Sequence, residues 1–133
     1  QVAVGKLKSL GVYGSDYNTV DGTGVRDYIH VVDLAKGHVK AIQALQKGLP
    51  GANAINLGTG NGISVLEMIN AFSDKNKVKI AYQIAPRRPG DIAACYADVS
   101  KAKRVLDWQA ELNISHMVKD SWNWQSKNPG GYN

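Results

Sequence analysis

Residues 21–31 read Asp21-Gly22-Thr23-Gly24-Val25-Arg26-Asp27-Tyr28-Ile29-His30-Val31. A glycine-containing loop here leads into β-branched and aromatic residues, which predicts a strand over 28–32. Asp33 is a preferred N-cap residue, and apolar residues then recur at helical spacing as far as Leu45. Arg26, at the end of the loop, would aim a fixed positive charge at an anionic ligand.

The same patterns continue on both sides of this stretch. On the N-terminal side we expect the tail of a helix over 2–9 and a strand over 10–13. Gly48 and Pro50 are expected to end the helix that follows Asp33. Further along we expect strands over 54–57, 78–84 and 94–97, a helix that begins at Ser64 with Glu67 completing a capping box, and helices over 100–107 and from 113 or 115. Mixed strands and helices without repeats indicate an α/β or α+β class and one domain, or one piece of a domain.

The composition bounds the class of protein. The chain has 133 residues, 44% of them hydrophobic, and a net charge of +5. We find no apolar run of membrane-spanning length and no basic-then-apolar leader, and we expect a cytoplasmic protein. Because Gln1 is not a natural start residue, we also expect a longer parent protein. The positive charge favours anionic partners, but the lysines are dispersed, which argues against a nucleic-acid-binding protein.

Several kinds of site are disfavoured by the residues present. One cysteine, Cys95, excludes an internal disulfide and a cysteine-rich metal site. The three histidines lack metal-ligand spacing, so we predict no metal site. None of the six tyrosines has a lysine four residues later, so the chain lacks an evident tyrosine–lysine pair for hydride chemistry. We therefore assign no catalytic residue.

The glycines of Gly58-Thr59-Gly60-Asn61-Gly62 lie between a predicted strand and a predicted helix. This position is compatible with a dinucleotide-binding loop. The spacing is not G-x-G-x-x-G, however, and no acidic residue ends a second strand about twenty residues later. We favour a structural turn, and we predict no cofactor-binding residue in the chain.

The segment Pro86-Arg87-Arg88-Pro89-Gly90-Asp91 is a proline-stiffened loop with two arginines. An arginine can bind a phosphate with two parallel hydrogen bonds, and an aspartate can accept hydrogen bonds from sugar hydroxyls. A surface pair between Arg88 and Asp91 is an equally good interpretation of this segment alone. For Arg26, the alternative is a salt bridge to Asp21, Asp27 or Asp33. For Tyr13, it is ordinary core packing.

The chain resembles the C-terminal part of the UDP-glucose 4-epimerase family, within the extended short-chain dehydrogenase/reductase superfamily. The similarity runs from Gln1 to Tyr132. It is carried by Gly11–Gly14 with Thr23–Val31, by Asn56–Gly60, and by Ala85–Asp91. It implies that residues 1–133 are the C-terminal, sugar-nucleotide-binding portion, an α+β part of a Rossmann-type protein whose N-terminal NAD-binding domain is absent from this chain.

The resemblance also implies roles for matching residues. The backbone around Gly11, Val12 and Tyr13 would contact uracil, with the Tyr13 ring beside the base. Arg26 and Arg88 would hold the pyrophosphate, and Asp91 would bond the ribose. The remaining substrate-binding candidates are Tyr28, near the same site, and Cys95, which lines the sugar pocket.

The activity implied is the interconversion of UDP-galactose and UDP-glucose, with NAD removing and returning a hydride at C4 of the hexose. The NAD-binding and catalytic motifs belong to the N-terminal part, so this chain alone is expected to be inactive. The partners implied are the UDP-sugar, the N-terminal domain and a second copy in a homodimer. Because the family has a bulky tyrosine or a small residue at the position of Cys95, we add the hypothesis that UDP-N-acetylhexosamines are also substrates. The alternatives are another UDP-sugar enzyme of the superfamily and a non-catalytic uridine-nucleotide-binding module.

Overall fold

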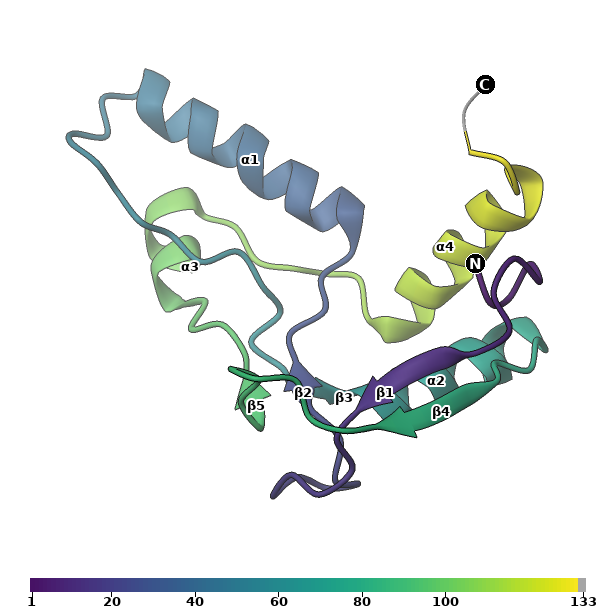
Figure 1. The fold of residues 1–133 in the computed structure, drawn as a ribbon. Helices are drawn as coiled ribbons and strands as arrows, with labels where there is room; N and C mark the ends of the chain where they lie inside the picture. Colours follow the sequence, from purple (N-terminus) through teal and green to yellow (C-terminus); the bar gives the residue numbers. More distant parts are fainter. Residues whose placement is uncertain (132–133) are drawn as a thin grey trace.

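A computed structural model describes residues 1–131. The order along the chain is β1 (Leu10–Tyr13), β2 (Val25–Arg26), α1 (Val31–Gln46), β3 (Ile63–Ser64), α2 (Val65–Asn76), β4 (Tyr82–Ala85), β5 (Ala94–Cys95), α3 (Ser100–Leu106) and α4 (Ile114–Lys127). Figure 1 shows α1 and α3 on one side of the molecule, α2 and α4 on the other, and the short strands β2, β3 and β5 between them. The mixed α/β class is confirmed.

Two small sheets position the loops of the molecule. Strands β1 and β4 pair in parallel, with Leu10 opposite Tyr82. Strand β2 is the centre of the other sheet, antiparallel to β3 and parallel to β5, so that Arg26 lies opposite both Ile63 and Cys95. These pairings bring three segments from different parts of the chain to the same place: the loop before β2, the loop after β4, and the start of α2.

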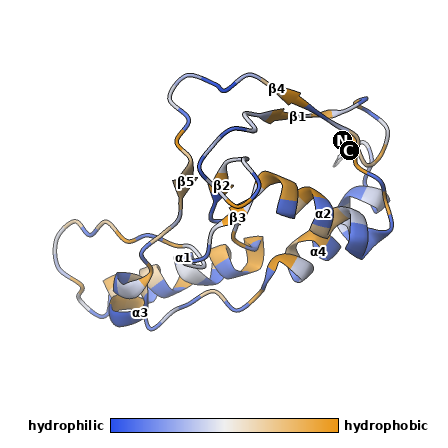
Figure 2. Ribbon diagram, turned by 90° about the horizontal axis from the view of Figure 1, so that it is seen from below, coloured by the Kyte–Doolittle hydropathy of each residue, from blue (hydrophilic) through white to orange (hydrophobic). Residues whose placement is uncertain are grey.

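The helices pack in two pairs. Helix α1 packs on α3 around buried Ala102, Leu106 and Trp108. Helix α2 packs on α4, where Phe72 meets Trp122 edge to face with ring centroids 6.0 Å apart. Strands β1 and β4 are hydrophobic in Figure 2, yet Leu10, Tyr82 and Ile84 remain exposed on them.

Several local predictions are confirmed. Strand β1 spans the predicted residues, and α1 ends at Gln46, before Gly48. The capping box of α2 is complete, since the Glu67 amide donates to the Ser64 hydroxyl at 3.0 Å and the Ser64 amide donates to the Glu67 carboxylate at 2.7 Å. Asn113 caps α4, accepting from the amides of Ser115 and His116.

Three predictions near the N-terminus are wrong. Residues 2–9 form turns in place of a helix, with Gly5 at a φ of +78°, which interrupts helical geometry. The strand predicted over 28–32 lies earlier, at Val25–Arg26. Helix α1 begins at Val31 with His30 as its N-cap, because the Asp33 carboxylate is used elsewhere. It accepts from the Glu111 and Leu112 amides at 3.0 and 2.8 Å and so holds the segment before α4.

Three later strand predictions are corrected. Residues 54–57 have no assigned strand, and Leu57 instead packs against the core between α1 and α3. Of residues 78–84, the strand takes only the last part and runs on to Ala85, since β1 is short and offers no partner to the earlier residues. The strand predicted over 94–97 is limited to Ala94–Cys95.

Candidate functional site

A pocket of about 320 Å³ lies where the loops before β2 and after β4 meet. It collects six of the eight substrate-binding residues predicted from the sequence. These are Gly11, Tyr13, Arg26, Tyr28, Arg88 and Asp91. Two arginines from separate strands and loops, beside two tyrosines, form a cationic hollow with aromatic walls, which suits a phosphorylated ligand with a planar ring.

Arg26 is oriented by the backbone around it. Its Nη1 donates to the carbonyl oxygens of Val25 at 2.7 Å and of Ile92 at 3.0 Å. Its Nη2 lies 4.0 Å from an oxygen of Asp91. Two carbonyl acceptors hold one edge of the guanidinium, while the other faces the pocket carboxylate. The group is thereby preorganised for an anion.

Arg88 reaches the same carboxylate from the other side. Its Nε donates to Asp91 Oδ2 at 2.9 Å, and its guanidinium carbon lies 4.7 Å from the centre of the Tyr13 ring. The hydrogen bond and charge of Asp91 raise the pKa of Arg88 above its ordinary value. The surface pair considered from the sequence is therefore present, and it lies inside the pocket. Asp91 bridges the two arginines.

Arg87 and Arg88 are adjacent but do different things. Arg87 turns out of the pocket, where its Nε and Nη2 donate to the carboxylate and carbonyl of Asp16 at 2.7 and 2.6 Å. Its guanidinium carbon lies 4.0 Å from the centre of the Tyr17 ring. The hydrogen bond from Arg87 lowers the pKa of Asp16. Arg87 fixes a neighbouring loop, and Arg88 remains at the pocket.

The other predicted residues are placed as follows. Tyr28 lines the pocket, and burial raises the pKa of its hydroxyl, with Arg26 partly opposing the shift. Val12 is 1% exposed, and its side chain does not line the pocket. Cys95 is exposed on β5, opposite Arg26, also outside the pocket lining. The individual roles of all eight residues stay predictions.

Comparison with known proteins assigns the chain to a family. The model of the GDP-mannose 4,6 dehydratase family matches residues 1–121. The chain belongs to this family.

Within the GDP-mannose 4,6 dehydratase family, the chain is similar to UDP-glucose 4-epimerases. That of Bifidobacterium longum is 61% identical over 132 residues, and that of Bacillus subtilis 59%. Each alignment covers 99% of this chain, and 38% and 39% of the relative. The crystal structure of the Bifidobacterium longum enzyme with NAD⁺ and UDP matches with a TM-score of 0.91 at 59% identity, covering 98% of this chain and 38% of that one. The chain spans about two fifths of the length of these relatives.

Four pocket residues of this family member are not among the sequence predictions. They are Leu10, Tyr17, Gly24 and Val65. Leu10 precedes Gly11, and Gly24 lies two residues before Arg26. Val65 follows the capping serine, and its amide donates to the Gly24 carbonyl at 3.1 Å. The sequence gives one indication for Tyr17: the residue lies in the loop between two segments that carry the resemblance.

The three aspartates considered as partners of Arg26 are used elsewhere. Asp21 accepts from the amide and hydroxyl of Thr23 and from the Ser64 hydroxyl. Asp33 holds the segment before α4, as described above. Asp27 binds the 58–62 loop. The alternative of a local salt bridge is therefore wrong, because Arg26 faces Asp91.

The glycines at 58–62 do not form an open anion site. The Asp27 carboxylate accepts from the amides of Thr59 and Gly60, each at 2.9 Å, from the Thr59 hydroxyl at 2.6 Å, and from the Ala97 amide at 3.2 Å. Burial alone would raise the pKa of Asp27, but these hydrogen bonds lower it overall. Because Asp27 already occupies the amides of Thr59 and Gly60, the structure supports the structural interpretation of the glycines, and the absence of a cofactor-binding residue stays a prediction.

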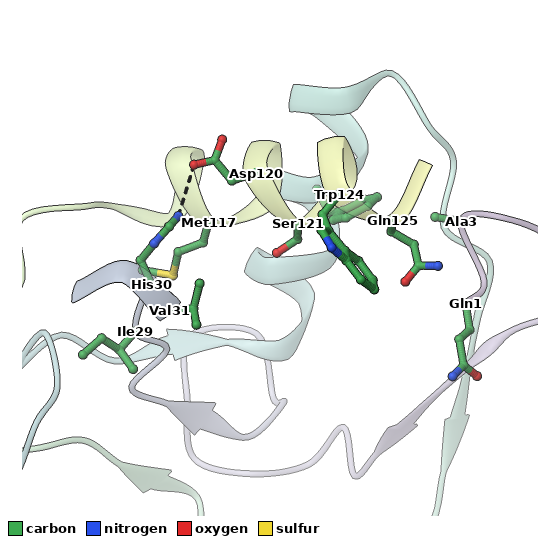
Figure 3. Close-up of a pocket in the computed structure, with 11 residues that line it drawn as sticks. Gln1, Ala3, Ile29, His30, Val31, Met117, Asp120, Ser121, Trp124 and Gln125 are labelled. Carbon is green, nitrogen blue, oxygen red and sulfur yellow. Dashed lines mark hydrogen bonds and ion pairs between the residues drawn. The ribbon is translucent and has the colours of Figure 1, made fainter. Parts of the chain in front are cut away.

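A second hollow, of about 560 Å³, lies between α4 and the segment before α1 (Figure 3). His30 and Asp120 meet there, with Nε2 and a carboxylate oxygen 3.2 Å apart. His30 Nδ1 accepts from the Val32 amide at 3.1 Å, so Nε2 carries the proton and donates to Asp120. Both ring nitrogens serve to cap and pin α1, which gives His30 a structural role.

Two other features concern residues 1–131. Among these residues, no helix combines the length and the apolar character needed to cross a membrane. Within the same range, histidine, cysteine and carboxylate side chains do not gather in groups of three or more that could hold a metal ion.

Proposed function

We propose that this chain is the sugar-nucleotide-binding part of a UDP-glucose 4-epimerase, an isomerase that interconverts UDP-galactose and UDP-glucose with NAD as hydride carrier. The observation that carries the proposal is the convergence of Arg26, Arg88, Asp91 and Tyr13 on one pocket. Sequence identity of 59–61% to named UDP-glucose 4-epimerases supports the assignment. By itself the chain is expected to be inactive.

In this proposal each residue binds or orients. The two guanidinium groups neutralise the pyrophosphate charge, and Tyr13 offers its ring to the uracil. When an anion reaches the arginines, Asp91 is released from them and can accept hydrogen bonds from ribose hydroxyls. NAD would be held by an N-terminal Rossmann domain outside residues 1–133, since Asp27 already occupies amides of the 58–62 loop.

The cellular setting is also a proposal. We place the full-length protein in the cytoplasm as a homodimer that takes part in galactose metabolism. The single free cysteine, Cys95, is exposed, which suits a reducing compartment. The homodimer follows from the resemblance to the epimerase family.

A turnover assay on the full-length natural polypeptide tests the proposal. With UDP-galactose and NAD, we expect formation of UDP-glucose. Formation of a 4-keto-6-deoxy sugar would favour the alternative of a dehydratase, which the name of the matching family suggests. UDP binding without any turnover would favour a non-catalytic uridine-nucleotide-binding module. Absence of UDP binding would contradict all three.

The substrate range rests on Cys95. This small, exposed residue lies on β5 opposite Arg26, a residue that lines the pocket, although Cys95 itself is not part of the pocket lining. We propose that the space left by the missing aromatic ring admits a 2-acetamido group, so that UDP-N-acetylglucosamine and UDP-N-acetylgalactosamine are also interconverted. The full-length protein should then act on both, and Cys95→Tyr should lose this activity while keeping UDP-galactose turnover. Absence of turnover on both acetamido sugars would contradict the hypothesis.

A further inference from the structure

The loop over residues 14–24 is held closed by its own hydrogen bonds. The Tyr17 amide donates to the Gly22 carbonyl at 2.9 Å, and the Thr19 hydroxyl donates to the Thr23 carbonyl at 2.7 Å. Thr23 is fully buried. A loop with this many internal bonds holds its side chains in place before any ligand arrives, so little ordering entropy is lost on binding.

Two outside contacts fix the same loop to the rest of the protein. Asp21 accepts from the Ser64 hydroxyl at the start of α2. Burial would raise the pKa of Asp21, but hydrogen bonds from Ser64 and Thr23 lower it overall, so the carboxylate is charged at neutral pH. Asp16 is held by Arg87 from the loop after β4. The 14–24 loop is thus anchored to both neighbours of the pocket.

Tyr17 is the residue that this anchored loop presents to the pocket. Its side chain is 6% exposed and lines the hollow together with Arg26 and Arg88. A Cβ added at Gly14 would lie 2.5 Å from Tyr17 Cε2, so the ring fits tightly against the backbone. The guanidinium of Arg87 covers the ring face.

The hydroxyl of Tyr17 is buried and has no hydrogen-bond partner among residues 1–131. A buried hydroxyl that is left unpaired loses its hydration without compensation, so such groups in native structures are normally satisfied by protein, water or ligand. The guanidinium of Arg88 lies 4.7 Å from the centre of the Tyr13 ring, and Arg88 and Tyr17 line the same pocket.

We propose that the Tyr17 hydroxyl donates a hydrogen bond to a phosphate oxygen of the nucleotide held by Arg26 and Arg88. This assignment rests on the proposed function. A phenol is protonated at neutral pH and is a neutral donor, and an oxygen drawn between two arginines is an anionic acceptor, which gives a charge-assisted hydrogen bond. Tyr17 would then be a positioning residue for the pyrophosphate, with Arg87 and Gly14 holding its ring.

The test is Tyr17→Phe in the full-length natural polypeptide, with UDP and uridine binding measured by calorimetry. Phenylalanine keeps the ring beneath Arg87 and removes the hydroxyl. We expect UDP to bind about 10- to 100-fold more weakly, as for loss of one hydrogen bond to a charged group, with uridine unaffected. UDP affinity within about twofold of the unaltered protein, or equal losses for UDP and uridine, would overturn the assignment.

Two comparisons separate this result from other causes. Tyr82→Phe removes an exposed hydroxyl on β4, outside the pocket, and should leave both affinities unchanged. The melting temperature of Tyr17→Phe should equal or exceed that of the unaltered protein, because an unpaired group is removed. A marked fall would show that the hydroxyl has a partner in the protein and would overturn the assignment. If the unaltered protein fails to bind UDP, the proposed function fails first, and the role of Tyr17 fails with it.

Discussion

The polar groups of the 58–62 loop are already paired within the chain, whereas those of the arginine pocket are accessible to a ligand. The loop has the glycines and the backbone amides of an anion site, but the Asp27 carboxylate of the same chain already occupies them. The pocket has no run of alternating glycines. Its two arginines both face one carboxylate, which a ligand can displace. A binding site needs donors that a ligand can reach, which depends on where the nearest carboxylate lies. Changes in the pocket should therefore alter binding, and changes in the loop should alter stability.

The largest effect is expected for Arg88→Ala, with UDP binding measured by calorimetry on the full-length protein. Removing one of two guanidinium groups that face the pyrophosphate should weaken UDP binding by about 100-fold, with little change in melting temperature. Arg104→Ala removes an exposed arginine on α3 and serves as the matched control. A loss below about threefold for Arg88→Ala would reduce Arg88 to a surface pair.

On the loop side, Asp27→Ala should lower the free energy of unfolding by about 2–3 kcal/mol. The substitution leaves the amides of Thr59, Gly60 and Ala97 without their acceptor, and part-buried donors are costly to leave unpaired. Chemical denaturation measures the change, and Asp74→Ala, on the exposed side of α2, is the control. Equal stability of Asp27→Ala and Asp74→Ala would show that the loop does not depend on Asp27.

A smaller loss, about 1–2 kcal/mol, is expected for Gly58→Ala. The new Cβ would lie 2.5 Å from Asp27 Oδ2 and 2.7 Å from the Ala97 Cβ, so the carboxylate or the segment after β5 must shift. Thermal unfolding measures this loss. Gly48→Ala offers a comparison, since a Cβ there meets nothing within 4 Å, although its φ of +89° adds backbone strain. A fully stable Gly58→Ala would contradict the tight packing of the loop.

Asp91→Asn sharpens the comparison from the pocket side. Without the charge that bridges Arg26 and Arg88, inorganic pyrophosphate should bind a few-fold more tightly, since an exposed ion pair is weak. UDP should gain less than pyrophosphate, because the carboxylate also accepts from the ribose in the proposed function. Titrations with the two ligands measure the ratio. A weaker affinity for pyrophosphate would show that Asp91 orients the arginines and does not compete for them.

The smallest effect is a pH dependence. Hydrogen bonds hold the folded pKa of Asp27 below the ordinary value of 3.8, so its stabilising contribution is present above that value and is lost as the pH falls through the folded pKa. Relative to Asp27→Asn, the unaltered protein should lose stability as the pH falls below about 4. Urea unfolding at several pH values measures the difference. Parallel curves for the two proteins would exclude this linkage.

The elements predictable from the sequence were those specified by local chemistry. Ser64 and Glu67 cap α2 through contacts three residues apart, and Asn113 caps α4 in the same way. The errors occurred where a distant partner decides. Asp33 looks like an N-cap, but one of its carboxylate oxygens accepts from the amides of Glu111 and Leu112. Residues 54–57 are β-type in composition but have no pairing strand.

The residues of the candidate site also differ in whether the sequence could predict them. Arg26, Arg88 and Asp91 were named from two motifs, because a resemblance carries distant pairing that local patterns lack. The local pattern alone could not separate Arg87 from Arg88, and only the resemblance selected Arg88. The structural difference is that Arg87 binds Asp16. It also missed Tyr17, whose importance depends on burial of a hydroxyl and not on residue type.

The parallel pairing of β1 with β4 has a consequence for the order of events during synthesis. Leu10 finds its partner only when Tyr82 has left the ribosome, and Arg88 follows a few residues later. Until then the segment that carries Arg26 lacks its opposing wall, and closing so long a loop is slow. Packing of α1 on α3 likewise requires that residues 100–106 have been synthesised. The nascent chain therefore presents no nucleotide pocket before Arg88 has emerged, and UDP can stabilise this part of the fold only after that point.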